Sequence, residues 1–181
     1  AELNKLFLEV IIANGFDNNA IKILKTKKNL RLIDATNYVS RELLKFVSFN
    51  KNIMVQSEDL NIFSKKNFKF VSKRKPTSKQ LKDLIFAFNV CRYVKSNAIV
   101  LASNETTVGI GSGQPSRLDS CQIAINKMKK FNLQNDNLVA ASDAFFPFVD
   151  GIEKLIQSGV RAVVQPSGSI RDKEIINFAN E

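Results

Sequence analysis

The stretch that decides the fold runs from residue 97 to residue 117 and reads Asn97-Ala-Ile-Val-Leu-Ala-Ser-Asn-Glu-Thr-Thr-Val-Gly-Ile-Gly-Ser-Gly-Gln-Pro-Ser-Arg117. Two short apolar runs, 98–102 and 106–110, flank the polar triplet Ser103-Asn104-Glu105, which predicts a β-hairpin. A glycine-rich turn follows and leads into a helix over about 116–130, whose apolar residues recur every three or four positions.

Strands and helices alternate along the rest of the chain. The segment Thr77-Ser-Lys-Gln80 is a capping box, and the apolar spacing from Leu81 to Val94 predicts a helix behind it. Further strands are expected at 7–13, 30–33, 46–49, 53–56, 68–72, 138–141 and 162–165, and further helices at 17–25, 147–157 and 172–179. Because strands alternate with helices, we predict an α/β fold, and the hairpin makes its sheet mixed. The sheet is expected to hold the strands near 7–13, 98–102, 106–111, 138–141 and 162–165, the first of them buried.

The composition excludes several kinds of active site. The 181 residues include no histidine, which rules out a Ser-His-Asp triad, a Cys-His pair and an imidazole base within this chain. Two cysteines without histidine do not make a zinc site, so no metal is expected. Cys91 and Cys121 fall in apolar helical stripes, which indicates buried thiols in a reducing cytoplasm. No apolar run approaches the roughly 20 residues of a membrane span.

The net charge of +10 is concentrated in the first half of the chain. Residues 1–80 hold 16 Lys and Arg against 7 acidic residues, a net charge of +9, with one tight cluster at Lys73-Arg74-Lys75. Such an excess is compatible with nucleic-acid binding. Since no nucleic-acid recognition module accompanies this charge, a solvated basic surface is the favoured interpretation.

Two segments at junctions between strands and helices could bind a ligand. Lys95-Ser-Asn97 precedes the hairpin, where its polar groups could bind an oxyanion or could cap a helix. Residues 109–117 bring glycines and Arg117 to a helix start, which suits an anionic or polar ligand. A tight turn with a solvent-facing arginine is the alternative.

Two later segments have the same character. Ser142–Asp150 holds three phenylalanines around a proline, which could wall a flat ring system or plug the core, with the aspartates as helix caps. Gln165–Arg171 again combines a strand end, a turn of small residues and a helix start. Because α/β sheets bind ligands at strand ends, we expect Asn97, Arg117, Phe145 and Asp150 to meet in one crevice.

The same segments resemble a known enzyme family. The resemblance rests on Lys95–Val100, Thr107–Arg117, Ala141–Ile152 and Gln165–Asp172, with Lys73–Thr77 and Phe7–Ile12 in agreement. These segments are similar to the AICAR transformylase domain, the formyltransferase part of the bifunctional purine-biosynthesis enzyme that also carries IMP cyclohydrolase. The resemblance covers nearly the whole chain and is weak over residues 34–67.

The resemblance implies an activity and a set of contacts. The family transfers a formyl group from 10-formyltetrahydrofolate to the 5-amino group of AICAR, without metal, as a cytoplasmic homodimer that binds neither nucleic acid nor membrane. It implies that Asn97, Arg117 and Phe145 contact AICAR, and that Leu118, Asp150, Ser169 and Ile170 line the folate site. No catalytic acid or base is implied within this chain, where Asn97 has a supporting role.

The resemblance also implies a place in a longer enzyme. Residues 1–181 correspond to the C-terminal part of the transformylase domain, which consists of two cytidine-deaminase-like α/β subdomains. Residues 1–75 would be the end of the first subdomain and the connection, and 76–181 most of the second. The family's Lys-His pair, credited with proton transfer, lies upstream of Ala1, so we expect a chain that is inactive alone. The alternatives are a stand-alone nucleotide- or folate-binding module without catalysis and a basic nucleic-acid-binding protein.

Overall fold

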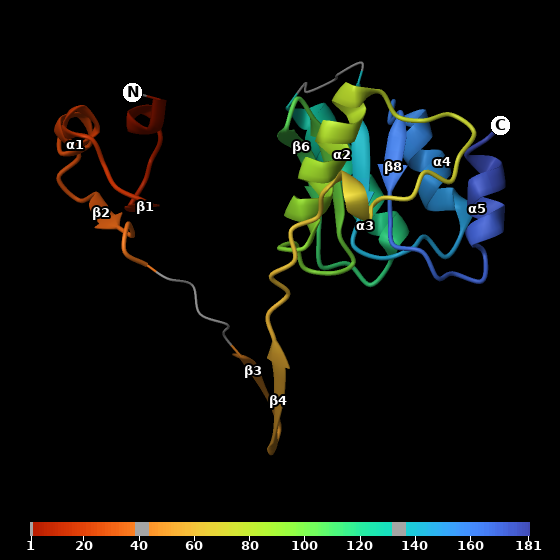
Figure 1. The fold of residues 1–181 in the computed structure, drawn as a ribbon, viewed down its shortest axis with the longest axis horizontal. Helices are drawn as coiled ribbons and strands as arrows, with labels where there is room; N and C mark the ends of the chain where they lie inside the picture. Colours follow the sequence, from red (N-terminus) through yellow and green to blue (C-terminus); the bar gives the residue numbers. More distant parts are fainter. Residues whose placement is uncertain (1, 39–43, 132–136) are drawn as a thin grey trace. The chain divides into compact units, whose positions relative to one another are not determined.

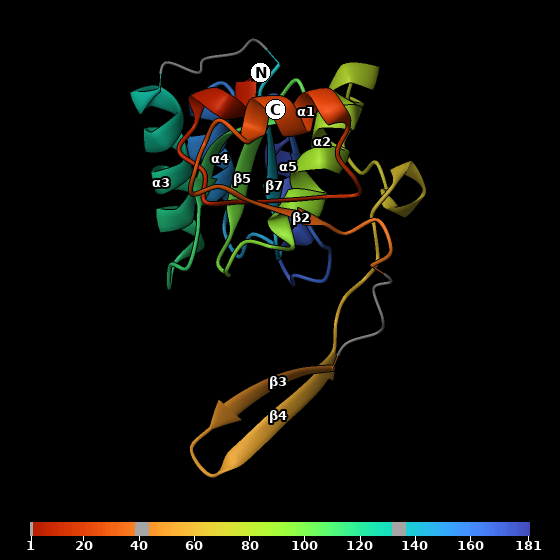
Figure 2. The same ribbon diagram turned by 90° about the vertical axis from the view of Figure 1, so that its left-hand side faces the viewer.

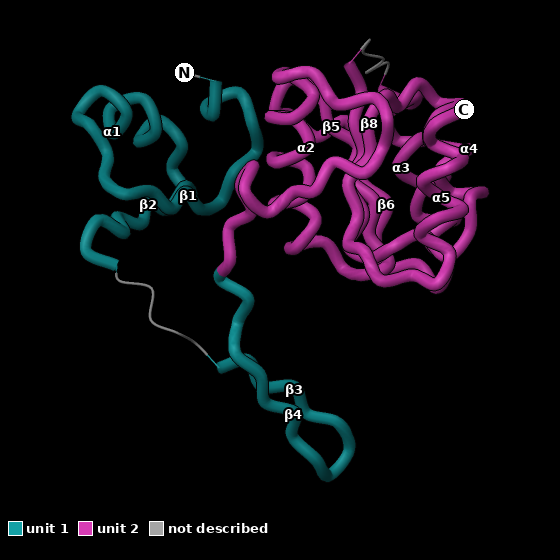
Figure 3. The backbone as a smooth tube through the Cα atoms, turned by 45° about the vertical axis from the view of Figure 1, so that its right-hand side comes forward, with its two compact units in different colours: residues 1–60 teal, residues 61–181 magenta. Residues whose placement is uncertain are grey.

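The computed structural model describes residues 2–38, 44–131 and 137–181. The chain forms two compact units, residues 1–60 and 61–181, which are described separately below (Figure 3). This division places the basic cluster Lys73–Lys75 in the larger, second unit.

The first unit begins with a short β-α-β arrangement. After a 3₁₀ turn, η1 (Glu2–Lys5), strand β1 (Val10–Ala13) leads through helix α1 (Asn18–Leu24) to strand β2 (Arg31–Asp34), which pairs parallel to β1. Asp17 caps α1 as expected, since its Oδ1 accepts a 2.7 Å hydrogen bond from the Ala20 N–H.

The expected place of the first strand is wrong in two respects. Strand β1 pairs with β2 in a sheet of its own rather than joining the main sheet, and its residues are exposed or half-buried. Val10 and Ile12 are 44% and 66% exposed. An apolar run shows that a strand can be buried, but the partner that would bury it is not encoded in the run itself.

The first unit also contains strands β3 (Leu44–Phe49) and β4 (Asn52–Ser57), which confirm the strands predicted at 46–49 and 53–56 (Figure 2). Their pairing as a hairpin is an addition from the structure. The strands pair antiparallel, with Phe46 opposite Val55. All twelve strand residues are exposed.

The second unit is built around a mixed four-stranded sheet. Strands β5 (Ile99–Ser103), β6 (Thr106–Gly111), β7 (Val139–Ser142) and β8 (Ala162–Val164) pair in the order β6-β5-β7-β8 within the described residues. Strand β5 runs antiparallel to both neighbours, whereas β7 and β8 are parallel, which confirms the mixed sheet. The predicted strand at 68–72 is wrong, because this segment pairs with no strand among the described residues and Phe68 instead packs edge-on against Phe88, with ring centroids 5.8 Å apart.

Helices cover both faces of this sheet (Figures 1 and 2). Helix α2 (Ser78–Cys91) lies on one face, and α3 (Arg117–Lys130) and α4 (Val149–Gln157) lie on the other, with α5 (Asp172–Phe178) next to α4. A short 3₁₀ turn, η2 (Lys65–Asn67), precedes α2. Alternate residues of β5 enter the two cores, so Ile99 and Leu101 face α3 while Val100 and Ala102 face α2.

The two cysteines are buried as predicted, one in each core. Burial raises the pKa of both thiols to about 12, which leaves them protonated at neutral pH. Among the described residues, no helix combines the length and the apolar character that crossing a bilayer requires.

Two turns fix the helices against the sheet. The predicted capping box at the start of α2 is confirmed, because the Gln80 N–H donates to Thr77 Oγ1 at 3.2 Å and the Thr77 N–H donates to Gln80 Oε1 at 2.9 Å. From within α2, the buried carboxylate of Asp83 accepts the N–H groups of Asn104 and Glu105 at 3.1 and 2.7 Å. The tip of the β5–β6 hairpin is thereby tied to the helix.

Glycines on β6 allow helix α3 to pack directly against the strand. A Cβ at Gly111 would lie 1.8 Å from the Ser120 carbonyl oxygen, and one at Gly109 would lie 2.2 Å from the Ala124 carbonyl oxygen. No side chain fits in either position. This close approach sets where the first turn of α3, with Arg117, lies relative to the strands.

Candidate ligand-binding site

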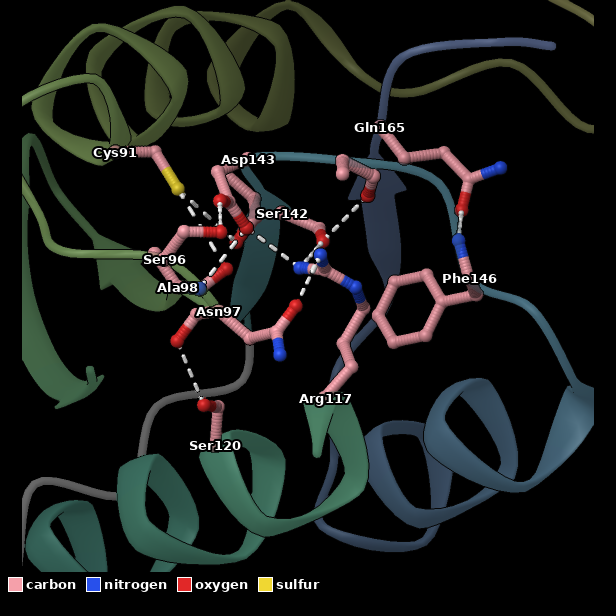
Figure 4. Close-up of polar contacts among 12 residues, drawn as sticks. Cys91, Ser96, Asn97, Ala98, Arg117, Ser120, Ser142, Asp143, Phe146 and Gln165 are labelled. Carbon is pink, nitrogen blue, oxygen red and sulfur yellow. Dashed lines mark hydrogen bonds and ion pairs between the residues drawn. The ribbon is translucent and has the colours of Figure 1, made fainter. Parts of the chain in front are cut away.

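Arg117 joins three segments of the chain at the start of α3 (Figure 4). Its Nη1 donates to Ser142 Oγ at 2.8 Å and to Asp143 Oδ1 at 2.5 Å, and its Nη2 donates to Asn97 Oδ1 at 2.7 Å. The side chain is only 8% exposed. The expected solvent-facing alternative for this arginine is therefore wrong.

Asp143 is the carboxylate that neutralises Arg117. Its Oδ1 also accepts the Ala98 N–H at 2.9 Å, and its Oδ2 accepts a hydrogen bond from the Ser96 hydroxyl. Burial by itself raises the pKa of this carboxyl, but the hydrogen bonds from Ser96, Arg117 and Ala98 outweigh it and hold the pKa below its ordinary value. Asp143 is therefore a fixed anion at neutral pH rather than a proton donor.

Asn97 is held on every polar atom of its side chain. Its Nδ2 donates to the carbonyl oxygens of Gln114 and Pro115 at 2.8 and 3.1 Å, while its Oδ1 accepts from Arg117. Its own carbonyl accepts from the Ser120 hydroxyl at 2.7 Å. The strand start and the helix start are thus locked together. The hydrogen bonds of Arg117 to described residues use three of its five N–H groups, which leaves two for a ligand.

A cavity of about 480 Å³ lies beside this network. It is lined by Asn97, Pro115, Ser116, Arg117, Leu118, Ala144, Phe145, Phe146, Pro147, Phe148, Asp150 and Gly151. The lining therefore combines the polar side chains of Asn97 and Arg117 with the rings of Phe145 and Phe148 and the carboxylate of Asp150.

The three phenylalanines of the 142–150 segment have different places. Phe146 is buried in the core, where its N–H donates to Gln165 Oε1 at 2.9 Å and its ring covers Gly151. Phe145 and Phe148 are 38% and 50% exposed and line the cavity. Of the two roles expected for this segment, core packing is the role of Phe146. Phe145 and Phe148 have exposed ring surface at the cavity, as the expected contact with a flat ligand requires.

The structure brings most of the sequence-predicted site residues together. Five of them line the one cavity, namely Asn97, Arg117, Leu118, Phe145 and Asp150. Ser169 and Ile170 are not among its lining residues, and the Ile170 side chain is fully exposed. The Asp150 carboxylate accepts the Gly151 N–H at 2.7 Å, in the first turn of α4.

Sequence reasoning missed the groups that hold the site in place. Ser96 and Ser142 lie in candidate segments, but the sequence suggests no role for either, and it suggests Asp143 only as a helix cap. The available signal was position, since Ser142 and Asp143 come at the end of a buried strand next to the expected ligand crevice. Within the described residues, no group of three or more His, Cys, Asp or Glu side chains is arranged to hold a metal ion.

Comparison with known proteins agrees with the resemblance seen in the sequence. The family model described as AICARFT/IMPCHase bienzyme matches residues 1–127. The bifunctional purine biosynthesis protein PurH of Persephonella marina is 44% identical over 181 residues, and those of Buchnera aphidicola subsp. Schizaphis graminum and Aquifex aeolicus are 46% and 45% identical. Each alignment covers 99% of this chain but only 34–35% of the relative, so the chain spans about a third of their length. With more than half of its residues matched by the family model, the chain belongs to the AICARFT/IMPCHase bienzyme family.

Proposed function

We propose that this chain carries part of the site at which a purine-biosynthesis formyltransferase moves the formyl group of 10-formyltetrahydrofolate to the 5-amino group of AICAR. The observation that carries the proposal is the single cavity shared by Asn97, Arg117, Phe145 and Asp150. A cavity lined by fixed polar donors and by aromatic rings suits a flat, polar heterocycle.

In this proposal AICAR and the folate contact different residues of the cavity lining. AICAR lies against Asn97, Arg117 and Phe145, where the two unused N–H groups of Arg117 donate to the nucleotide and the Phe145 ring packs on its base. The folate lies against Leu118 and Asp150, with Ser169 and Ile170 on the neighbouring loop. Asp143 keeps Arg117 charged and oriented without contacting either ligand.

The family's wider properties complete the proposal. The chain is the C-terminal part of the transformylase domain, residues 76–181 form most of a second cytidine-deaminase-like subdomain, and residues 1–75 are the end of the first subdomain and the connection. The longer enzyme is a cytoplasmic homodimer that uses no metal and binds no nucleic acid. The position of the chain within that enzyme stays a prediction, as does the dimer.

A binding experiment with matched variants tests the proposal. AICAR and folate are titrated into the 181-residue chain by calorimetry, and the same is done with Phe145→Ala and Phe131→Ala. Phe145 lines the cavity, whereas Phe131 ends α3, is 64% exposed and lies outside the cavity lining. AICAR affinity is expected to fall about tenfold or more in F145A and to stay unchanged in F131A. Equal AICAR affinities in the two variants would show that AICAR does not bind in this cavity and would contradict the proposal.

A second candidate is a binding module without catalysis. It is favoured by the lack of histidine in the chain and by the hydrogen bonds that already fix Asp143 and Asn97. Binding of both ligands together with no formyl transfer, even when the parts of a full-length relative outside the aligned region are supplied, would select this candidate.

A further inference from the structure

A cation, Arg171, contacts one of the residues that line the cavity and was assigned no role by the sequence. The guanidinium carbon of Arg171 lies 4.7 Å from the centroid of the Phe148 ring, and Phe148 lines the cavity. This distance is within the range of a cation–π contact. The guanidinium therefore lies over the Phe148 ring, and this contact leaves its N–H groups available as hydrogen-bond donors.

The N–H edges of Arg171 are weakly engaged. The partner of its side chain among the described residues, apart from the Phe148 ring, is Glu174, and their 3.8 Å separation is an ion pair but too long for a hydrogen bond. Both side chains are about half exposed, 50% and 52%. An exposed pair of this kind contributes little and exchanges readily for a better-placed anion.

The loop that carries Arg171 is well fixed. The Gly168 N–H donates to Asp172 Oδ2 at 2.8 Å, the Arg171 N–H donates to Ser169 Oγ at 3.1 Å, and the Asp172 N–H donates to the Ser169 carbonyl at 3.1 Å. Gln165, at the start of the loop, holds the Phe146 main chain. The main chain of Arg171 is thus fixed by hydrogen bonds within the turn, which holds its side chain beside Phe148.

The other charges of the cavity do not provide a free cation. Arg117 is neutralised by Asp143 at 2.5 Å, and the other charged residue of the lining, Asp150, is acidic. From this arrangement we propose that Arg171 binds the anionic group of the ligand whose flat ring lies against Phe148, and so determines specificity for anionic ligands. The inference rests on the proposed function. Either co-substrate could bring that anion, AICAR as a phosphate or the folate as its glutamate carboxylates.

The test compares each ligand with its uncharged counterpart, using the full 181-residue chain. One pair is AICAR and its nucleoside, which lacks the phosphate. The other is folate and the diamide in which both glutamate carboxylates are carboxamides. We expect the chain to prefer the anionic member of one pair by about five- to tenfold, and the pair that shows the preference identifies the source of the anion.

Variants then assign the preference to Arg171. Arg171→Ala should abolish it, Arg171→Lys should retain part of it, and Glu174→Gln should increase it because the competing carboxylate is gone. Lys173→Ala removes a neighbouring exposed charge from the same helix and should leave the preference unchanged.

The outcomes separate the two proposals. If AICAR and folate bind but the preference is absent, or persists in R171A, the inference about Arg171 is overturned while the proposed function stands. If no member of either pair binds the wild-type chain, the proposed function fails for this chain and the inference fails with it.

Discussion

The Nη2 group of Arg117 donates a hydrogen bond to Oδ1 of Asn97 across 2.7 Å, which ties the first turn of α3 to the residues before strand β5. Both side chains are also held by other partners, Arg117 by Asp143 and Asn97 by two main-chain carbonyls. The site therefore exists as a rigid frame before a ligand arrives. A substitution at either residue should change stability and ligand binding together.

Asn97→Ala should lower both the stability of the chain and its affinity for AICAR. It leaves an Arg117 N–H and the Pro115 carbonyl without their partner. The Gln114 carbonyl loses the side-chain hydrogen bond but keeps the one from the main-chain N–H of residue 97. We therefore expect the free energy of unfolding to fall by about 1–3 kcal/mol. AICAR affinity should fall about tenfold or more. Urea denaturation and calorimetry measure the two effects. Asn126→Ala is the control, since Asn126 is exposed on α3, and its effect should stay within about 0.5 kcal/mol.

Asp143→Asn should destabilise the chain in a pH-dependent way. At neutral pH it leaves the buried Arg117 without its anion, which costs about 3 kcal/mol. The pKa of Asp143 lies below its ordinary value of 3.8 in the folded chain, so its stabilisation is present above pH 3.8 and is lost as the pH falls through the lowered pKa. The difference in unfolding free energy between wild type and D143N should therefore be constant from pH 7 to about 5 and shrink below 3.8.

Urea midpoints measured from pH 7 down to pH 3 check this expectation. A difference between the two proteins that stays the same at pH 3 would mean that the carboxylate charge is not what stabilises the network. Ser96→Ala serves as a companion variant, because it removes one hydrogen bond to Asp143 and keeps the charge pair with Arg117.

Local patterns predicted the second unit well. The capping box at Thr77, the continuous apolar run of β5 and the glycine turn after β6 are each set by neighbours in sequence, and each is present in the structure. The sheet predicted for the strand at 7–13 and the strand predicted at 68–72 are both wrong, because the environment of each segment depends on residues distant in the sequence. Strand β1 found its partner in β2, and Phe68 packs on Phe88.

The candidate site followed the same division. Arg117, Phe145 and Asp150 could be selected because their residue types are unusual at junctions of strand and helix. Asp143, the anion that fixes Arg117, could not be selected from the sequence, because an aspartate before a helix is also a preferred helix cap. Only the sheet order, which puts the end of β7 beside the start of β5, brings Asp143 to Arg117.

Gly111→Ala should be far more damaging than Gly159→Ala. A methyl group at Gly111 would meet the Ser120 carbonyl at 1.8 Å, so α3 must move, and we expect a loss of about 3 kcal/mol. Gly159 has φ of +98° but open space around it, and alanine there should cost about 1 kcal/mol through backbone strain alone. Thermal and urea unfolding of both variants give the comparison. Equal losses would show that α3 does not depend on its contact with β6.

Glu105→Gly should stabilise the chain. Glu105 lies in the tip of the β5–β6 hairpin with φ of +52°, a conformation that costs a residue with a Cβ about 1–2 kcal/mol and costs glycine little. Part of this gain is offset by the greater freedom of glycine in the unfolded chain, about 0.4–1 kcal/mol. The net result should be a rise of about 0.5–1 kcal/mol in unfolding free energy, measured in urea. A decrease would mean that the glutamate side chain contributes a contact that outweighs the strain.

The isolated 181-residue chain should show negligible formyl transfer and no cyclohydrolase activity. The aromatic amine of AICAR must lose a proton as it attacks the formyl carbon, and a well-placed general acid or base contributes roughly 10²–10⁴-fold to such a step. The chain has no histidine, both thiols have a pKa of about 12, and Asp143 is held as an anion by hydrogen bonds from Arg117, Ser96 and Ala98. Arg117 stays protonated at any usable pH and cannot accept the proton.

We therefore expect ligand binding without turnover, measured by the absorbance change as 10-formyltetrahydrofolate becomes tetrahydrofolate. Full-length PurH of Aquifex aeolicus, a relative 45% identical to this chain, is the positive control. Turnover by the chain at a rate near that of the control would show that a residue within it, with Lys95 and Asp150 the first to substitute, moves the proton after all.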